Sequence, residues 1–262
     1  MITAGCDVGS LTSKAVIIRD GRIIGSAIIR SSSRPEISAQ KVMDEALEKA
    51  KISQSGVEYC VGTGYGRDNI PFVDQARSEI ACHARGAVWL APATKTIIDI
   101  GGQDCKAIRL DKNGRVEKFL TNDKCAAGTG RFLEVMAKLL GVSVDDLGKM
   151  SKKSREPVTL ASTCTVWAQA DVIQYINSGI PVEDVGAGVN NAMAGRVATL
   201  ANAVHAQREV AMTGGVAKNA GVVRSLEKLI GHKVTIIRKA DPQLAGAIGA
   251  AVLASDVKEG RA

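Results

Sequence analysis

A strand-and-turn segment that occurs twice limits what this chain can fold into more than any other feature of its sequence. The first copy covers residues 4–18 and the second covers residues 97–110. Each copy brings an apolar run to an Asp, continues with an aliphatic residue and Gly, and reaches Lys-Ala and another apolar run after a few variable residues. Asp7 and Lys14 are therefore equivalent to Asp99 and Lys106. Two copies are too few for a solenoid, so the repeat predicts a duplicated fold with two similar lobes.

The segments around the repeat predict alternating strands and helices. After each copy, a turn leads into a third extended stretch, which is typical of hairpins and is expected at residues 23–29 and 116–120. Apolar periodicity predicts further strands at residues 57–61 and 209–212 and helices at 36–51, 75–90 and 243–254. This alternation indicates an α/β fold. The first lobe should comprise residues 1–95, completed by a C-terminal helix within residues 243–262, and the second lobe residues 96–242.

The turn after each Asp carries groups that suit phosphate. Glycine lets the backbone approach a ligand, and successive N–H groups in such a turn form a nest for an anion. In the first copy the turn and the strand after it supply Ser10, Leu11, Thr12, Ser13 and Lys14. The sequence therefore predicts a phosphate site at each copy.

The acidic residues of the two copies suggest how a phosphate bond could be cleaved. Asp7 and Asp99 should lie at strand ends and face each other across a cleft, where a hydrated Mg²⁺ between them would remove their repulsion. Gln103 and Asp104 are candidates to orient the attacking water.

A third glycine loop, Thr213-Gly214-Gly215, follows a predicted strand and precedes a predicted helix. The chain has neither the GxxxxGK[ST] spacing of a P-loop nor a GxGxxG fingerprint after a strand. The two repeat loops and this third loop resemble the sugar kinase, Hsp70 and actin superfamily over nearly the whole chain. The resemblance implies a ribonuclease H-like fold in each lobe, ATP in the cleft, and Gly214, Gly215 and Asn219 beside the adenosine. It also implies that the final helix, residues 243–254, closes back against the first lobe.

Composition narrows the partners. Aromatic residues make up only 3% of the chain, too few for a surface that stacks bases, and the net charge of +7 is not gathered in a dense basic run. We therefore expect no nucleic-acid binding, and an acidic ligand or partner would suit the charge. No signal peptide or membrane-spanning stretch is recognisable, which favours a cytoplasmic protein whose six cysteines are reduced.

Two of the cysteines, Cys125 and Cys164, each come shortly before an amphipathic helix. A helix N-terminus lowers a thiol pKa and favours the thiolate that metals require. One chain offers only two such positions, whereas a [4Fe–4S] cluster usually needs four, so a two-fold dimer would have to supply the others. From the residues alone, metal-free thiols at helix starts and a tetrahedral zinc site across a dimer remain alternatives.

The segments around these cysteines, residues 122–134 and 162–166, closely resemble the activators of 2-hydroxyacyl-CoA dehydratases. Relatives of those activators are the ATP-binding subunits of benzoyl-CoA reductase and the reductases of double-cubane cluster proteins. The resemblance extends to residues 63–67 and 101–104. It implies a homodimer, one bridging [4Fe–4S] cluster ligated by Cys125 and Cys164, and an ATPase that drives electron transfer.

The same resemblance implies the partners and the nucleotide site. The electron donor would be a ferredoxin or flavodoxin, and the acceptor an iron–sulfur dehydratase or reductase. Residues placed near ATP are Ser10, Leu11, Thr12, Ser13, Lys14, Gly101, Gly102, Gln103, Arg131, Gly214, Gly215, Asn219 and Gln243.

One departure leaves the acceptor open. After Cys164 the activators usually show Phe followed by Ala-Glu-Ser-Glu, whereas this chain has Trp167 followed by Ala168-Gln169-Ala170-Asp171. Two other functions stay possible at this stage. One is a small-molecule kinase of the same fold, such as an amino-sugar kinase, and the other is an ATP-dependent switch without iron.

Overall fold

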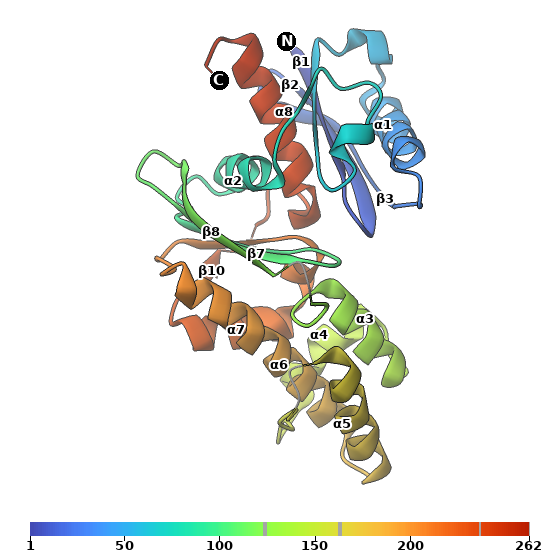
Figure 1. Cartoon of the computed structure of the whole chain (residues 1–262), viewed down its shortest axis with the longest axis vertical. Helices are drawn as coiled ribbons and strands as arrows, with labels where there is room; N and C mark the ends of the chain where they lie inside the picture. Colours follow the sequence, from blue (N-terminus) through green and yellow to red (C-terminus); the bar gives the residue numbers. More distant parts are fainter. Residues whose placement is uncertain (123–124, 162–163, 236, 262) are drawn as a thin grey trace. The chain divides into compact units, whose positions relative to one another are not determined.

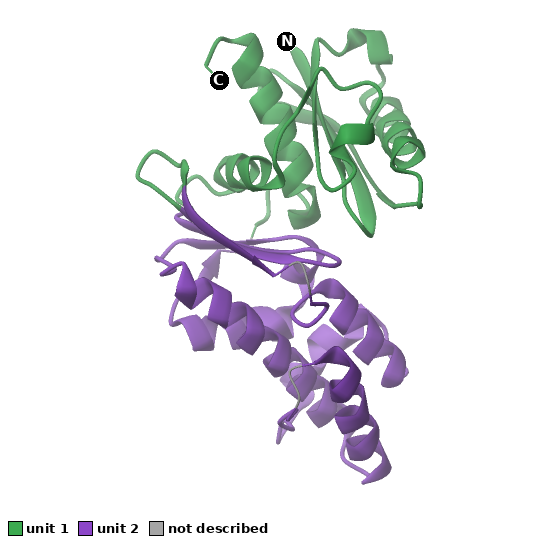
Figure 2. Cartoon of the chain, in the orientation of Figure 1, with its two compact units in different colours: residues 1–94, 110–116, 237–262 green, residues 95–109, 117–236 purple. Residues whose placement is uncertain are grey.

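The computed structural model describes the whole chain except residues 123–124, 162–163, 236 and 262. Its contacts divide the chain into two compact units (Figure 2). Unit 1 comprises residues 1–94, 110–116 and 237–262, and unit 2 comprises residues 95–109 and 117–236. The division into lobes at residues 95/96 and 242/243 stays a prediction.

In unit 1, the described residues form a five-stranded sheet in the order β3-β2-β1-β4-β5. Strand β2 pairs antiparallel with both β1 and β3, whereas β4 is parallel to β1 and β5 is parallel to β4. Their bounds are β1 Ile2–Val8, β2 Thr12–Arg19, β3 Arg22–Arg30, β4 Tyr59–Thr63 and β5 Gln75–Ala76.

Helices cover the sheet of unit 1. Helix α1 (Pro35–Ala50) packs on β2 and β3 through a stripe of apolar side chains that includes Val42, Ala46 and Leu47. Helix α8 (Ala245–Lys258) lies along β1 and β4 and also packs against α2 (Glu79–Leu90) (Figure 1). The small residues of α8 allow this contact, since a Cβ on Gly249 would lie 1.7 Å from the carbonyl oxygen of Cys82.

Unit 2 repeats the sheet of unit 1. Its described residues form a five-stranded sheet in the order β10-β9-β6-β7-β8, with β6 and β7 antiparallel and β9 parallel to β6. Read from its other edge, this order is β8-β7-β6-β9-β10, in which β6 takes the place of β1 and β9 the place of β4. The two units therefore share one strand order, which confirms the predicted duplication. The bounds are β6 Thr96–Ile100, β7 Cys105–Leu110, β8 Val116–Asn122, β9 Val210–Thr213 and β10 Val234–Thr235.

The helices of unit 2 surround one long helix, α6 (Val182–Ala203), which packs on each of the others. The largest apolar cluster lies here and includes Phe132, Met136, Leu147 and Met193. The remaining helices are α3 Gly130–Leu139, α4 Val144–Lys153, α5 Thr165–Asn177 and α7 Ala220–Ile230.

Two helix boundaries differ from the sequence-based prediction. The helix expected from residue 75 begins at Glu79, because residues 75–76 pair with β4 and the Ser78 hydroxyl accepts a hydrogen bond from the N–H of Ala81. The helix expected at residues 243–254 is α8, which begins at Ala245 after a 3₁₀ turn at Pro242–Leu244 and continues to Lys258. Among the described residues, no helix has the length and apolarity needed to cross a membrane.

Candidate nucleotide and cluster sites

In unit 1, Asp7 lies near the end of β1 directly opposite Lys14 of β2. The Lys14 Nζ lies 3.2 Å from the Asp7 Oδ2, and the Asp7 residue is 3% exposed. Thr63, the last residue of β4, is the neighbour of Asp7 on the parallel side. A buried carboxylate is thus held beside a cation at the carboxyl end of two parallel strands.

Unit 2 places Asp99, Lys106 and Thr213 in the same register. The Lys106 Nζ lies 3.6 Å from the Asp99 Oδ2 and 2.5 Å from the Asp104 Oδ2. The Thr213 hydroxyl donates to the Asp99 Oδ1 over 2.8 Å. Asp104 is therefore part of an ion-paired cluster that is almost fully buried.

The turns after the two acidic residues have the same backbone hydrogen bond. The N–H of Gly9 donates to the carbonyl of Thr12 over 3.1 Å, and the N–H of Gly101 donates to the carbonyl of Asp104 over 3.0 Å. The equivalence of the two copies thus extends from sequence to geometry.

Gly64 and Gly214 are a second equivalent pair, one residue beyond β4 and β9. Both have a left-handed backbone, with φ of +92° and +81°. A Cβ on Gly64 would lie 2.4 Å from the Val8 carbonyl oxygen and 2.7 Å from the Asp7 Oδ1. A Cβ on Gly214 would lie 2.2 Å from the Ile100 carbonyl oxygen and 3.1 Å from the Asp99 Oδ1. Only glycine fits either position without displacing the carboxylate strand.

The other residues predicted near ATP fall in both units. In unit 1, Ser10 is exposed, whereas Ser13 is buried and its hydroxyl lies 2.9 Å from that of Ser31. Gln243 lies in the 3₁₀ turn before α8. Gln103 and Arg131 of unit 2 are exposed. The turn after β6, at Gly101 and Gly102, anchors the start of α3, because the carbonyls of these two glycines accept hydrogen bonds from the N–H groups of residues 130 and 131.

Asn219 has a structural role at the start of α7. Its side-chain oxygen accepts from the N–H of Val222, and its amide nitrogen donates to the Asn190 side chain. Asn190 in turn donates to the Leu147 carbonyl and the Ser151 hydroxyl. The contact of Asn219 with adenosine stays a prediction. The buried amide pair lacked a sequence signal, because residues 190 and 219 meet only through helix packing.

His83 of α2 stands next to Cys82 in a predicted helix, a context that favours a packed or surface residue over a ligand, and its side chain is buried. A Cβ on Gly246, in the first turn of α8, would lie 3.1 Å from the His83 Nε2 and 2.8 Å from the Asp7 Oδ2. The histidine therefore borders the carboxylate of the first copy. Neither spacing nor a motif could predict this, because His83 lies on α2 and Asp7 on β1. The two residues come together only because α8 packs against both elements.

The six cysteines separate into two kinds. Cys125 and Cys164 are exposed, and Cys6, Cys60, Cys82 and Cys105 are buried. Burial raises the pKa of Cys6 well above its usual value and raises the pKa values of Cys60, Cys82 and Cys105 to about 12, so these thiols stay protonated and unreactive.

The prediction that both exposed cysteines lie at helix starts is correct for one of them. Cys164 is the N-cap residue of α5, but α3 begins only at Gly130, with Thr129 as its N-cap. Cys125 lies in the preceding loop, where the Asn122 side chain donates to the carbonyls of residues 125 and 127. The motif residues Asp123, Lys124, Ser162 and Thr163 lie outside the described residues.

The sequence pattern predicts one apolar face for α5 made of Val166, Trp167, Val172, Ile173 and Ile176, and the structure arranges these side chains differently. Ala168 and Val172 are buried, whereas Val166 and Trp167 are 66% and 68% exposed. Ile173 and Ile176, expected on the same packed face, are exposed as well. The departure that begins at Trp167 thus lies on the open first turn of α5, next to Cys164.

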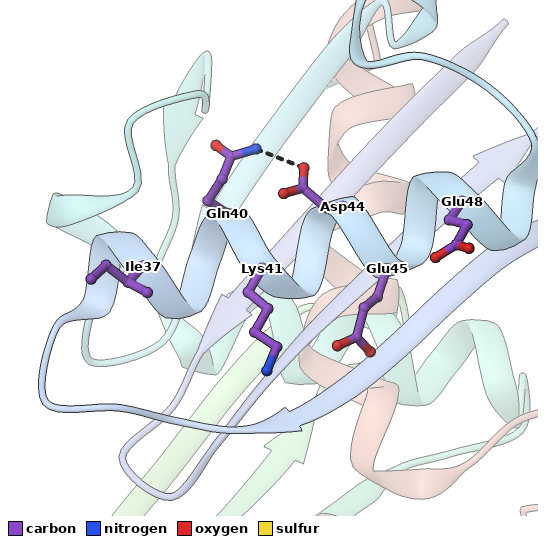
Figure 3. Close-up of a pocket in the computed structure, with 6 residues that line it drawn as sticks. All are labelled: Ile37, Gln40, Lys41, Asp44, Glu45 and Glu48. Atoms are coloured by element: carbon purple, nitrogen blue, oxygen red, sulfur yellow. Dashed lines mark hydrogen bonds between the residues drawn. The ribbon is translucent and has the colours of Figure 1, made fainter.

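A surface depression elsewhere has no link to these sites. It follows the outer face of α1 and is lined by one stripe of that helix (Figure 3), namely Ile37, Gln40, Lys41, Asp44, Glu45 and Glu48. Gln40 donates to Asp44 across one turn. None of the residues predicted to bind a ligand lines it.

Comparison with known proteins agrees with this architecture. A ROK family glucokinase from Streptomyces griseus aligns with a TM-score of 0.60 at 15% identity, covering 98% of this chain and 100% of that chain, which reflects the fold alone. Two units of one strand order, each with a buried Asp–Lys pair beside a glycine turn, give the chain the α/β fold of sugar kinases, Hsp70 and actin.

Closer relatives define the family. The 2-hydroxyisocaproyl-CoA dehydratase activator of Clostridioides difficile is 44% identical over 256 residues, 98% of this chain and 96% of that protein. The activator of lactoyl-CoA dehydratase of Anaerotignum propionicum is 43% identical over 259 residues, 99% of each. Residues 4–254 match the BadF/BadG/BcrA/BcrD ATPase family. The chain belongs to this family and is an ATPase.

A solved structure confirms the fold in detail. The activator of the 2-hydroxyisocaproyl-CoA dehydratase from Clostridium difficile with bound ADPNP aligns with a TM-score of 0.94 at 44% identity. The alignment covers 100% of this chain and 97% of that chain.

Proposed function

We propose that this ATPase transfers single low-potential electrons to a partner iron–sulfur enzyme. The observation that carries the proposal is that Cys125 and Cys164, alone among the six cysteines, expose their thiols, and both belong to unit 2. The names of the relatives support a 2-hydroxyacyl-CoA dehydratase or a benzoyl-CoA reductase core as the acceptor. The resemblance around Cys125 and Cys164 adds a double-cubane cluster protein as a third candidate.

The exposed cysteines fit one edge of a [4Fe–4S] cluster. Cys125 and Cys164 are the two exposed thiols, since the other four cysteines are buried, and one chain would therefore supply two of the four sulfur ligands. A homodimer would bring Cys125 and Cys164 of both copies together and complete the four thiolates. Bound there, the cluster would supply a one-electron carrier.

The equivalent Asp–Lys pairs fit a nucleotide and Mg²⁺. Lys14 contacts only one carboxylate oxygen of Asp7 by ion pairing, which leaves Oδ1 for a magnesium-bound water. We propose that Asp99 lies beside the hydrated Mg²⁺ as well, held in place by Thr213 on its Oδ1 and Lys106 on its Oδ2. Gln103 and Asp104 would orient the attacking water. The other nucleotide contacts come from Ser10–Lys14, Gly101, Gly102, Arg131, Gly214, Gly215, Asn219 and Gln243. The bound ADPNP of the solved relative supports ATP as the ligand.

The remaining partners follow from the chemistry. A low-potential carrier needs a low-potential donor, and we propose a ferredoxin or flavodoxin in the cytoplasm. ATP hydrolysis would provide the driving force for an electron that otherwise moves uphill.

Iron analysis after anaerobic purification tests the cluster directly. The native protein should be brown and contain four iron and four sulfide per dimer, as expected of one [4Fe–4S] cluster. Cys125→Ser and Cys164→Ser should each lose the iron and still bind ATP, whereas Cys82→Ala, at a buried thiol, should keep it. A full cluster in either serine variant would contradict the ligand assignment, and zinc in place of iron would contradict the redox function.

A second experiment tests the coupling to ATP. Prereduced protein should reduce its acceptor only while ATP is hydrolysed, and ADPNP should not replace ATP. Equal electron transfer without nucleotide would contradict the proposal. An iron-free protein that phosphorylates a sugar would be the kinase alternative, and one that only assembles with ATP would be the switch.

A further inference from the structure

Arg196 of α6 is the charged residue that links the two exposed cysteines. Arg196 lies on α6, and α6 packs against both α3 and α5, the helices that follow Cys125 and Cys164. Its guanidinium carbon lies 4.6 Å from the centroid of the Phe132 ring, and Phe132 is fully buried in α3. A guanidinium over an aromatic face is held by the ring quadrupole as well as by packing. The charge of Arg196 is therefore fixed in place.

The stem of Arg196 lies against the loop that carries Cys125. A Cβ on Gly128 would lie 3.4 Å from the Arg196 Cβ and 3.9 Å from its Cδ. Gly128 has a φ of +83°, and the Asn122 amide holds the same loop by its two hydrogen bonds to backbone carbonyls. The loop is thus fitted over the arginine stem.

Electrostatics connects the same guanidinium to both thiols. Burial lowers the pKa of Arg196, and the negative charges of Cys125 and Cys164 raise it. Because arginine stays protonated in proteins, the residue is a permanent cation that packs against the Cys125 loop and whose charge acts on the sulfurs of Cys125 and Cys164. It can compensate thiolate charge wherever those sulfurs bind metal.

We propose that Arg196 is a positioning residue of the cluster site, which compensates the charge of Cys125 and Cys164 and raises the reduction potential of the cluster they hold. This inference rests on the proposed function. A cluster with four thiolates is anionic, and one-electron reduction adds a further negative charge. A fixed cation nearby favours the reduced form, since net charge is one of the factors that set cluster potentials.

A redox titration of the purified dimer tests this. Arg196→Met removes the charge and keeps an unbranched apolar stem, Arg196→Lys keeps the charge, and Arg224→Met removes an exposed arginine from α7 of the same unit. At the midpoint potential of the native cluster, Arg196→Met should lower the ratio of reduced to oxidised cluster about tenfold, which corresponds to 59 mV for one electron. The Lys variant and the α7 control should stay close to the native ratio.

Each outcome decides the inference. A native midpoint in Arg196→Met with full iron content would overturn it. If Arg196→Met loses iron, retention of iron in Arg196→Lys supports a charge role, and loss in both variants overturns it in favour of packing. Native protein without iron would instead contradict the proposed function, and the inference with it.

Discussion

Lys106 is the buried cation of the second repeat copy. It is 4% exposed and contacts the carboxylates of both Asp99 and Asp104. A buried ion pair adds little net stability, but removing one partner leaves an uncompensated charge in a medium of low dielectric constant. In this cluster two carboxylates would be left.

We expect Lys106→Met to lower the free energy of unfolding by about 3–5 kcal/mol, measured by urea denaturation. Adding Asp104→Asn should restore part of the loss, because it removes one of the stranded charges. Lys112→Met, in an exposed turn, is the control. A loss below about 1 kcal/mol would mean that water reaches the carboxylates.

The glycine beside Asp99 can be tested against a glycine that shares only its backbone conformation. Gly214 and Gly231 both have positive φ, but nothing lies within 4 Å of a Cβ on Gly231. Gly231→Ala should cost about 1 kcal/mol from backbone strain alone. Gly214→Ala should cost more and also weaken ATP binding, measured by calorimetry, because its methyl group would meet the Ile100 carbonyl. Equal costs would contradict the steric argument.

At the scale of elements, Asp184 joins the start of α6 to the end of α4. One carboxylate oxygen accepts hydrogen bonds from the Ser154 hydroxyl and from the N–H groups of residues 155 and 156. These hydrogen bonds, that of Ser154 first, lower the pKa of Asp184. A carboxyl whose pKa is lower in the folded state stabilises the fold above its unfolded pKa, and this stabilisation is lost as the pH falls through the folded value.

Asp184→Asn should therefore destabilise the protein equally at all pH values above about 5, and the difference from the native protein should shrink only below pH about 4. Chemical denaturation at several pH values measures it. Glu183→Gln, the adjacent acidic residue in the same helix turn, controls for the helix dipole and should cost less. A difference that changes between pH 6 and 8 would assign the effect to another group.

The sequence predicted elements best where a local pattern repeats. The Asp–Lys register followed from two aligned copies, and strand order was duplicated as expected. The equivalence of Gly64 and Gly214 did not follow, because it depends on parallel pairing between strands far apart in the chain. The distance between Cys125 and the start of α3 did not follow from the sequence either. The loop from Cys125 to Thr129 is held by side-chain hydrogen bonds of Asn122 and contains a glycine with positive φ. Arg196 and His83 owe their positions to helix packing and had no local signal.

At the scale of the whole molecule, unit 1 is built from both ends of the chain. Residues 237–262 belong to unit 1, and α8 packs on β1, β2, β4 and α2. Its buried residues include Ala247, Ile248 and Ala251, so deleting it would expose one side of the sheet of unit 1.

Removal of residues 237–262 should unfold unit 1 and leave unit 2 folded. Hydrogen exchange should then be fast in β1, β2 and β4 and remain slow in β6 and β9. Removal of residues 259–262 alone, beyond the last turn of α8, should change neither, because the Arg261 side chain is mostly exposed and Asp256 keeps its ion pair with Arg85. Protection of β1 in the longer deletion would show that the sheet holds without its helix.

The return of the chain to unit 1 has a consequence for synthesis on the ribosome. Units usually fold in the order in which they are translated. In this chain the segments of unit 2 are complete before those of unit 1, although unit 1 is begun first. Helix α8, which covers β1, is therefore synthesised only when translation is nearly finished. A product terminated before residue 237 lacks the helix that packs beside Asp7.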